Sequence, residues 1–132
     1  MTRLVLSTFL TLSSLPAYGA WVEVNVNAEA DQRVYVDPES IRRRGDIAEM
    51  WALYDSQTAQ PAVGKSYLSR KVQTEYDCTQ YMKRMVSVIE YSGNMGSGDV
   101  VFKNSAFFST AKWMPAHSGL GQTLLKLACG KK

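Results

Sequence analysis

The chain has few of the residues from which catalytic and metal sites are commonly built. It contains one histidine, His117, and two cysteines, Cys78 and Cys129. Structural zinc needs four ligands, usually in paired Cys and His clusters, and oxidised cysteines cannot supply them. No ligand spacing joins His117 to the scattered carboxylates, and no G-x-S-x-G nucleophile motif is present. The sequence therefore predicts a non-enzymatic protein with no cofactor and no metal, in which His117 is a solvated loop residue.

The chain also lacks a strong excess of one charge and a long apolar run. Lys and Arg number 15 against 12 Asp and Glu, which gives a net charge of +3. Polyanion-binding proteins usually concentrate far more positive charge, so nucleic acid is not an expected partner. A membrane-spanning helix needs roughly 20 apolar residues. The run from Leu4 to Leu15 is shorter and is interrupted by Ser and Thr, so no membrane span is expected.

Residues 1–19 have the features of a secretory signal peptide. Arg3 supplies a positive start, Leu4 to Leu15 supply the apolar run, and Pro16 ends it before small residues. A buried N-terminal helix is disfavoured because this run has no polar face. Cleavage is expected after Gly19, with Ala20 as the alternative, and no cysteine lies there to carry a lipid anchor. We expect an exported protein, periplasmic or secreted, in which residues 20–132 form one domain.

The two cysteines are expected to form a disulfide. Both lie in the part that would be exported, their number is even, and oxidising compartments favour disulfides in small domains. A catalytic cysteine assisted by His117 is the alternative interpretation. It is disfavoured because an exported thiol with one available partner usually oxidises. We therefore predict a Cys78–Cys129 bridge.

Alternation of apolar and polar residues predicts a domain rich in strands. The expected strands are 21–27, 33–36, 46–54, 66–76 and a return strand that starts at 100–102. A turn is expected at residues 37–40, and a loop at 57–64 because this stretch contains Pro61 and Gly64. In segment 66–76 the odd-numbered residues are expected to face solvent.

The C-terminal half contains one ambiguous segment, a glycine turn and a helix. Thr79–Ser92 fits a strand by its β-branched and aromatic residues, while its apolar spacing also fits a helix. Gly93–Gly98 predicts a hairpin turn, since a phosphate-binding loop would need a following Lys-Ser/Thr and a helix start. A closing helix is expected after Ser118-Gly119. It should dock by an apolar stripe made of Leu120, Leu124, Leu127 and Ala128.

The densest charge run is Arg42, Arg43 and Arg44. One interpretation is a solvated loop that flanks a strand. The other is a contact for sulfated glycans or acidic proteins, because Arg offers planar, bidentate donors. Arg70 and Lys71 would extend this patch if their strand lay beside it. The aromatic residues expected in the core rather than in a ligand platform are Trp21, Trp51 and Trp113.

Several landmarks occur together over nearly the whole mature chain. They are Trp21-Val22, Val34 to Asp37, Ser40 to Arg42, Trp51, Glu75 to Cys78, Tyr91 to Gly98, Trp113 with Pro115, and Ala128-Cys129. This set resembles the surface-adhesin protein E family of Gram-negative bacteria, and the acidic-Cys segment with the glycine turn is its most specific part. The resemblance implies an α+β fold, with an antiparallel sheet of about six strands and a C-terminal helix tied back by the Cys78–Cys129 bridge. It also favours a strand for Thr79–Ser92.

The resemblance further implies a function in binding. The type member of the family is an adhesin that engages host extracellular-matrix proteins, which implies an exported binding module that recognises a host or envelope protein or glycan. A periplasmic structural or accessory protein of the cell envelope is the alternative. A small hydrolase would require His117 within hydrogen-bond reach of a serine or carboxylate in a pocket. No family binding motif maps onto this chain, so Arg42, Arg43 and Arg44 stay the candidate binding residues.

Overall fold

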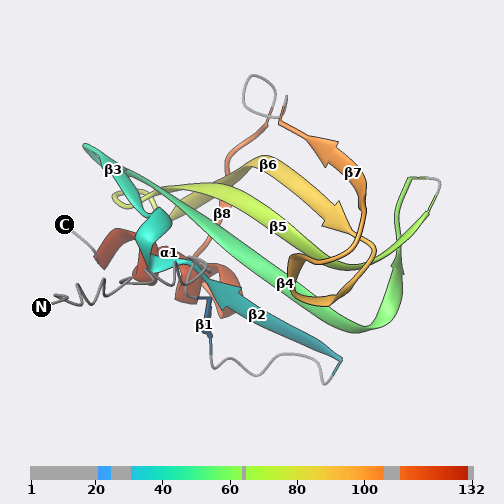
Figure 1. The fold of residues 1–132 in the computed structure, drawn as a ribbon. Helices are drawn as coiled ribbons and strands as arrows, with labels where there is room; N and C mark the ends of the chain where they lie inside the picture. The colour runs from blue at the N-terminus through green and yellow to red at the C-terminus, as the bar shows by residue number, and fades with distance from the viewer. Residues whose placement is uncertain (1–20, 25–30, 64, 106–110, 131–132) are drawn as a thin grey trace, which may run out of the picture.

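A computed structural model of the chain describes residues 21–24, 31–63, 65–105 and 111–130. These residues form one antiparallel sheet with a helix packed against it (Figure 1). The sheet path runs through β1 (Val22–Glu23), β2 (Gln32–Val36), β4 (Ile47–Pro61), β5 (Ser66–Asp77), β6 (Met82–Tyr91) and β7 (Val100–Asn104). The short strands β3 (Arg42–Arg44) and β8 (Met114–Pro115) pair with β4 and β6, and the helix is α1 (Gly119–Gly130). The predicted fold class is confirmed, with two short strands beyond the expected six.

Strand alternation gives the sheet two faces with different cover. Even-numbered residues of β4 and β5 face α1, and we call this side the helix face. Its core contains Val34, Val36, Ala48, Met50, Ala52 and Tyr76 from the strands, together with Leu124, Leu125 and Ala128 from the helix. The opposite side, with the odd-numbered residues of β4 and β5, is called the open face. Helix α1 lies on the other side of the sheet, and the helical turn over the open face is the short 3-10 helix η2 (Asn94–Gly96), among the residues that the structure describes (Figure 1).

The docked stripe of α1 differs from the predicted stripe by one residue. Leu124 and Ala128 are buried as expected, but Leu125 is buried where Leu127 was expected. Leu127 is 43% exposed. Apolar residues one, three and four positions apart all share one side of a helix, so the spacing allows either leucine to dock. The contact with the sheet selects Leu125.

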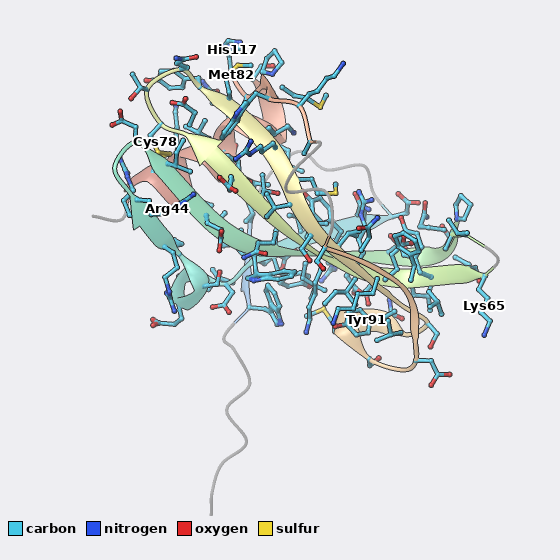
Figure 2. The ribbon with its side chains drawn as sticks, turned by 90° about the horizontal axis from the view of Figure 1, so that it is seen from above. Arg44, Lys65, Cys78, Met82, Tyr91 and His117 are labelled. Carbon is cyan, nitrogen blue, oxygen red and sulfur yellow. A yellow bond between two sulfur atoms is a disulfide. The ribbon has the colours of Figure 1, made fainter. Side chains whose placement is uncertain are left out.

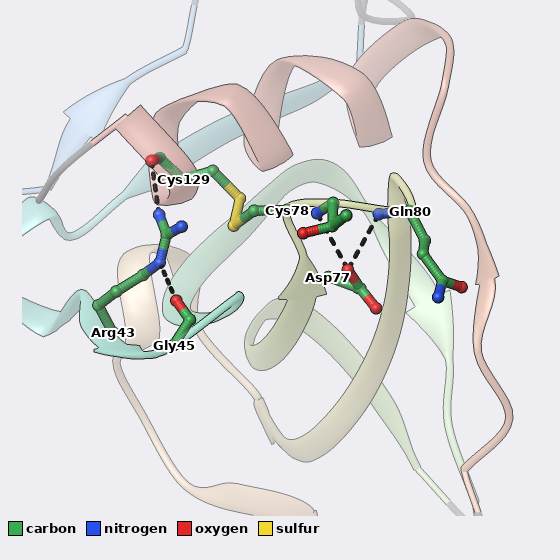
Figure 3. The surroundings of a disulfide bond; sticks show 7 residues. Arg43, Gly45, Asp77, Cys78, Gln80 and Cys129 are labelled. Atoms are coloured by element: carbon green, nitrogen blue, oxygen red, sulfur yellow. Dashed lines mark hydrogen bonds between the residues drawn. A yellow bond between two sulfur atoms is a disulfide. The ribbon is translucent and has the colours of Figure 1, made fainter.

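The C-terminal end of α1 is tied to the sheet by two interactions (Figure 3). Cys78 and Cys129 form the predicted disulfide, with their Cα atoms 5.8 Å apart. Arg43 Nη1 donates a hydrogen bond of 2.8 Å to the carbonyl oxygen of Cys129. A cation at the C-terminal end of a helix satisfies a free carbonyl and complements the helix dipole. Arg43 therefore has a structural role that the sequence did not indicate.

Three predicted boundaries are wrong in detail. The arginine run is not a loop but strand β3, which pairs with β4 through a turn in which Gly45 has φ = 56°. The segment 57–64 is not wholly a loop, because β4 continues to Pro61 after an irregularity in its pairing with β5 between Asp55 and Gln60. Proline is tolerated at the end of a strand, where no ladder N–H is needed. Strand β1 covers only Val22–Glu23, and Asn25–Asn27 lie outside the described residues.

The other strand predictions agree with the structure. Segments 33–36, 46–54 and 66–76 fall within β2, β4 and β5, apart from Asp46 at the first position. Thr79–Ser92 contains strand β6 rather than a helix, and residues 93–98 form the turn from β6 to β7. The proposed signal peptide, residues 1–19, lies outside the described residues. Among the residues that the structure describes, no helix is long and apolar enough to cross a membrane.

Candidate binding face

The open face is partly covered, which corrects one prediction. The odd-numbered residues of β5 were expected to face solvent, but Ser69 and Glu75 are fully buried and Lys71 and Gln73 are partly buried. Two features provide the cover. The β6–β7 turn lies over one end of the face, and an ion-pair cluster fills the other.

The β6–β7 turn is fastened to the open face by Ser69 and Asp55. Ser69 Oγ donates to the carbonyl oxygen of Gly93 at 2.6 Å and accepts from the amide of Gly96 at 2.9 Å. Asp55 Oδ1 accepts from Asn94 Nδ2 at 3.1 Å and from the amide of Met95 at 2.8 Å. These bonds give the turn a defined place on the sheet.

Replacing Asp55 with alanine should loosen this turn without unfolding the domain. The change removes two bonds to a charged acceptor, each worth about 1.5 to 3 kcal/mol at most and less at this exposed site. We expect a loss of about 1 to 2 kcal/mol in the free energy of unfolding and faster proteolysis between β6 and β7. Urea unfolding and limited proteolysis would measure both. Asp99→Ala, in the same turn, is the matched control, and equal losses for the two variants would contradict the assignment.

Aromatic residues line a hollow at the middle of the open face. The hollow has a volume of about 280 Å³ and is lined by Trp21, Asp37, Trp51, Lys71, Ile89 and Tyr91. The ammonium group of Lys71 lies 5.8 Å from the ring centre of Trp21 and 5.2 Å from that of Tyr91. Both distances are within the range of cation–π attraction. Trp21 and Trp51 were expected in the core but are only partly buried, and both face this hollow.

A buried carboxylate organises the other end of the open face. Glu75 Oε2 lies 3.4 Å from Nη2 of Arg44 and 3.4 Å from Nη2 of Arg84. The guanidinium carbon of Arg84 lies 4.5 Å from the ring centre of Trp113. Beside this cluster, Gln73 donates a hydrogen bond to Glu49. Trp113 therefore covers an arginine rather than filling the core.

The arginine run is divided between the two faces. Arg42 and Arg44 pair in register with Glu49 and Ile47, so they belong to the open face, while Arg43 belongs to the helix face. Arg42 Nη1 donates to the carbonyl oxygens of Glu39 and Ile41 at 2.9 and 3.0 Å. All three arginines are exposed.

The two basic residues of β5 are divided in the same way. Lys71 belongs to the open face, on the far side of Trp51 from Arg42 and Arg44 (β3 and β5 in Figure 1). Arg70 lies on the helix face with its guanidinium carbon 5.1 Å from the ring centre of Tyr54. Strand β4 lies between β3 and β5, so the strand of Arg70 and Lys71 does not lie beside the arginine run, although Lys71 shares the open face with Arg42 and Arg44.

His117 lies outside both the aromatic hollow and the ion-pair cluster of Glu75. It is exposed, lies just before α1, and does not line the hollow (Figure 2). Within residues 21–24, 31–63, 65–105 and 111–130, no group of three or more His, Cys, Asp or Glu residues could hold a metal ion.

Sequence reasoning found only part of the hollow. Trp21 and Trp51 were noticed but assigned to the core, and Asp37, Ile89 and Tyr91 carried no signal of their own. The available signal was parity, since Trp51, Lys71, Ile89 and Tyr91 are all odd-numbered residues on adjacent strands. That signal becomes useful only once the pairing register of those strands is known.

Comparisons with known proteins relate the chain to one family. The model of the family described as surface-adhesin protein E matches residues 21–130. Two crystal structures of protein E from Haemophilus influenzae are similar, with TM-scores of 0.58 and 0.56 at 14% and 16% sequence identity. The first alignment covers 82% of this chain and 87% of the other, and the second covers 83% and 75%. These likenesses show a shared fold. No curated protein matches the chain.

Proposed function

Because this chain belongs to the surface-adhesin protein E family, we propose that it is an exported, non-enzymatic binding module that recognises a host or envelope protein or glycan. In this proposal residues 1–19 are the signal peptide that directs export, and residues 20–132 form the binding domain. The partner docks on the open face of the sheet. The observation that carries the proposal is the aromatic hollow at the centre of that face.

The composition of the hollow favours a binding role. Trp21, Trp51 and Tyr91 present large, rigid apolar surfaces that remain partly exposed. Trp and Tyr dominate the energetics of protein interfaces because they bury much area with few rotatable bonds. Tryptophans are highly buried on average, although seldom completely. Here two of them face a hollow on the side of the sheet away from the helix.

Charge around the hollow favours an acidic partner. Lys71 lies within it, and Arg42 and Arg44 flank it on β3. Arg42 and Arg44 are exposed at the sheet edge, where their remaining N–H donors can reach a carboxylate or a sulfate. We therefore keep Arg42 and Arg44 as contact residues. Arg43 is proposed as a supporting residue, because its guanidinium is held by Gly45 and Cys129 on the opposite face.

Capture by the oxidised exported protein tests this proposal. The immobilised protein is exposed to purified extracellular-matrix proteins, to isolated envelope proteins, and to sulfated and neutral glycans. We expect Trp51→Ala to weaken capture of a partner about tenfold or more, as for a central interface residue. We expect Arg42→Gln with Arg44→Gln to weaken it several-fold, and more strongly at low salt.

Lys65→Gln is the matched control for these variants. Lys65 is exposed at the β4–β5 turn, at the end of the molecule opposite Arg44 (Figure 2). Its loss removes one positive charge, against two in the double arginine variant, without touching the open face, so capture should be unchanged. Equal capture by Trp51→Ala and the unaltered protein would exclude the hollow as the docking site. Export itself is tested separately, since a mature protein confined to the periplasm would favour an envelope partner over a host partner.

A further inference from the structure

A second cavity lies on the helix face, between the sheet and the beginning of α1. It has a volume of about 210 Å³ and is lined by Tyr54, Arg70, Val72, Thr74, Tyr76, Lys83, Arg84, Met85, Met114 and Leu124. Pockets for drug-sized ligands measure about 300 to 1,000 Å³. This cavity therefore suits a smaller molecule. It does not touch the hollow on the open face.

The lining of the cavity is basic and contains no carboxylate. Arg70 and Lys83 bring positive charge to it. Arg84 also lines it, but its guanidinium is paired with Glu75 and Trp113 on the other face. Glu90 pairs in register with Arg70 across β5 and β6 and does not line the cavity. Glu90 therefore compensates part of the charge of Arg70, while the excess of positive groups in a concave lining still favours anions.

Two details place this positive charge inside the cavity rather than in solvent. Arg70 Nε is buried and has no hydrogen-bond partner among the described residues. Lys83 Nζ lies 3.3 Å from the position that a Cβ atom would take at Gly121, in the first turn of α1. The first turn of a helix carries partial positive charge and free N–H groups, so the ammonium gains nothing from this neighbour. An anion in the cavity would supply a counter-charge to the guanidinium of Arg70 and to the ammonium of Lys83.

The rest of the lining is apolar and adaptable. Met85 and Met114 are 37% and 59% exposed, although methionine is usually well buried. Methionine side chains are flexible and polarisable, and they are common on surfaces that accommodate different ligands. Val72 and Leu124 complete an apolar wall beside the two cations.

Two tyrosines add neutral hydroxyl groups. Burial raises the pKa of Tyr54, an effect that the nearby charge of Arg70 opposes. Burial also raises the pKa of Tyr76 well above its usual value. The neighbouring Tyr54 raises it further, and a hydrogen bond with Thr74 lowers it. Both phenols are therefore protonated at neutral pH and can donate hydrogen bonds to an anion.

We propose that this cavity binds a small amphipathic anion, namely a monocarboxylate with a short aliphatic body. Its carboxylate accepts from Arg70 and Lys83, and its aliphatic chain lies against Leu124, Met85 and Met114. A fully polar anion would leave the methionines exposed, and a neutral apolar molecule would leave the charges of Arg70 and Lys83 without a counter-charge in the cavity. The combination of two cations with an apolar wall selects a ligand that has both parts.

Octanoate is the probe, and octanol and octylamine are the matched neutral and cationic compounds. All three are titrated into the oxidised protein below the micelle concentration, with binding followed by calorimetry and by the methyl signals of labelled methionine. We expect octanoate to shift the signals of Met85 and Met114 and to bind about tenfold or more tightly than octanol, the size of one charge-assisted hydrogen bond. Octylamine should not bind.

Lys83→Gln should weaken octanoate binding about tenfold, while Lys126→Gln should change it less than about twofold. Lys126 is exposed on α1 and does not line the cavity, so Lys126→Gln removes one positive charge, as Lys83→Gln does, from a site outside the cavity. Unfolding curves of Lys83→Gln and Lys126→Gln check that the fold is intact. Arg70→Lys is a further cavity variant, which keeps the positive charge and removes the Nε donor. Equal binding of octanoate and octanol, unchanged binding in Lys83→Gln, or methionine shifts away from the cavity would overturn the proposal.

Discussion

Replacing Cys78 and Cys129 with serine is expected to lower the free energy of unfolding by about 4 kcal/mol. The two cysteines are separated by 51 residues in the sequence. In the chain-entropy model, a cross-link that closes a loop of this length restricts the unfolded chain by about that amount. Small domains have a total stability of about 5 to 15 kcal/mol, so the double variant should be close to its unfolding threshold at physiological temperature.

The effect should be largest at the C-terminal end of α1. The disulfide, the bond from Arg43 to the carbonyl oxygen of Cys129 and the buried side chain of Ala128 hold this end, while Leu124 and Leu125 hold the middle of the helix in the core. Without the cross-link, the hydrogen bond from Arg43 and the packing of the small side chain of Ala128 remain to keep the last turn on the sheet. Hydrogen exchange should therefore speed up first in the residues around Cys129.

Urea unfolding of the exported protein and of the double serine variant measures the difference. Adding a reductant should destabilise the unaltered protein by the same amount and leave the double serine variant unchanged. This control separates loss of the cross-link from any effect of the serine side chains. A difference below about 1 kcal/mol would mean that the unfolded chain is already compact, so that the cross-link restricts it little.

The core of this fold could be predicted from sequence because its strands obey simple alternation. In β5 the even-numbered residues Val72 and Tyr76 are buried on the helix face, as a period of two requires. The disulfide could be predicted from composition alone, since an exported chain with two cysteines has a single possible pairing. Both inferences use information that is local in sequence or independent of the fold.

The ambiguity of Thr79–Ser92 has a physical cause in the structure. The pairing of β5 with β6 shifts register at one point, because Gln73 pairs with Ser87 while Thr74 pairs with Met85. Val86 is the extra residue of this β-bulge. An added residue breaks the period of two, so the apolar residues on either side of it no longer alternate and resemble helical spacing. No single-sequence rule identifies such a residue in advance.

The cover of the open face could not be predicted for a different reason. Ser69, Glu75 and Lys71 are polar, and polar residues at alternate positions normally indicate solvent. Ser69 and Glu75 are buried and Lys71 is partly buried because groups distant in sequence reach this face, among them the turn at Gly93 and the guanidinium group of Arg44. The same long-range geometry divides the arginine run between faces. Alternation indicates which residues of a strand share a face, but it does not indicate which other segments cover that face.

Replacing Glu75 with glutamine is expected to lower the free energy of unfolding by about 3 kcal/mol. Removal of one partner from a buried ion pair typically costs about 3 to 5 kcal/mol, because the remaining charge loses its compensation. Here Arg44 is largely exposed and keeps access to water, whereas the side chain of Arg84 is only 22% exposed. The penalty therefore falls mainly on Arg84, which places the expected loss at the lower end of that range.

Arg44→Gln is expected to cost less than about 1 kcal/mol, since its side chain is 67% exposed and solvent screens its pairing. Glu39→Gln is the control, because it removes one carboxylate, as Glu75→Gln does, but at an exposed position. Its free energy of unfolding should be within about 0.5 kcal/mol of that of the unaltered protein. The free energy of unfolding in urea is measured for these three variants and for the double variant Glu75→Gln with Arg44→Gln.

If Glu75→Gln and Arg44→Gln lower the free energy of unfolding equally, the pair behaves as a surface ion pair, and Glu75 does not hold Arg84 beneath Trp113. A large and unequal loss would instead identify Glu75 as the residue that fixes this end of the open face, so that Arg44 can meet a partner without an unpaired charge buried beneath it.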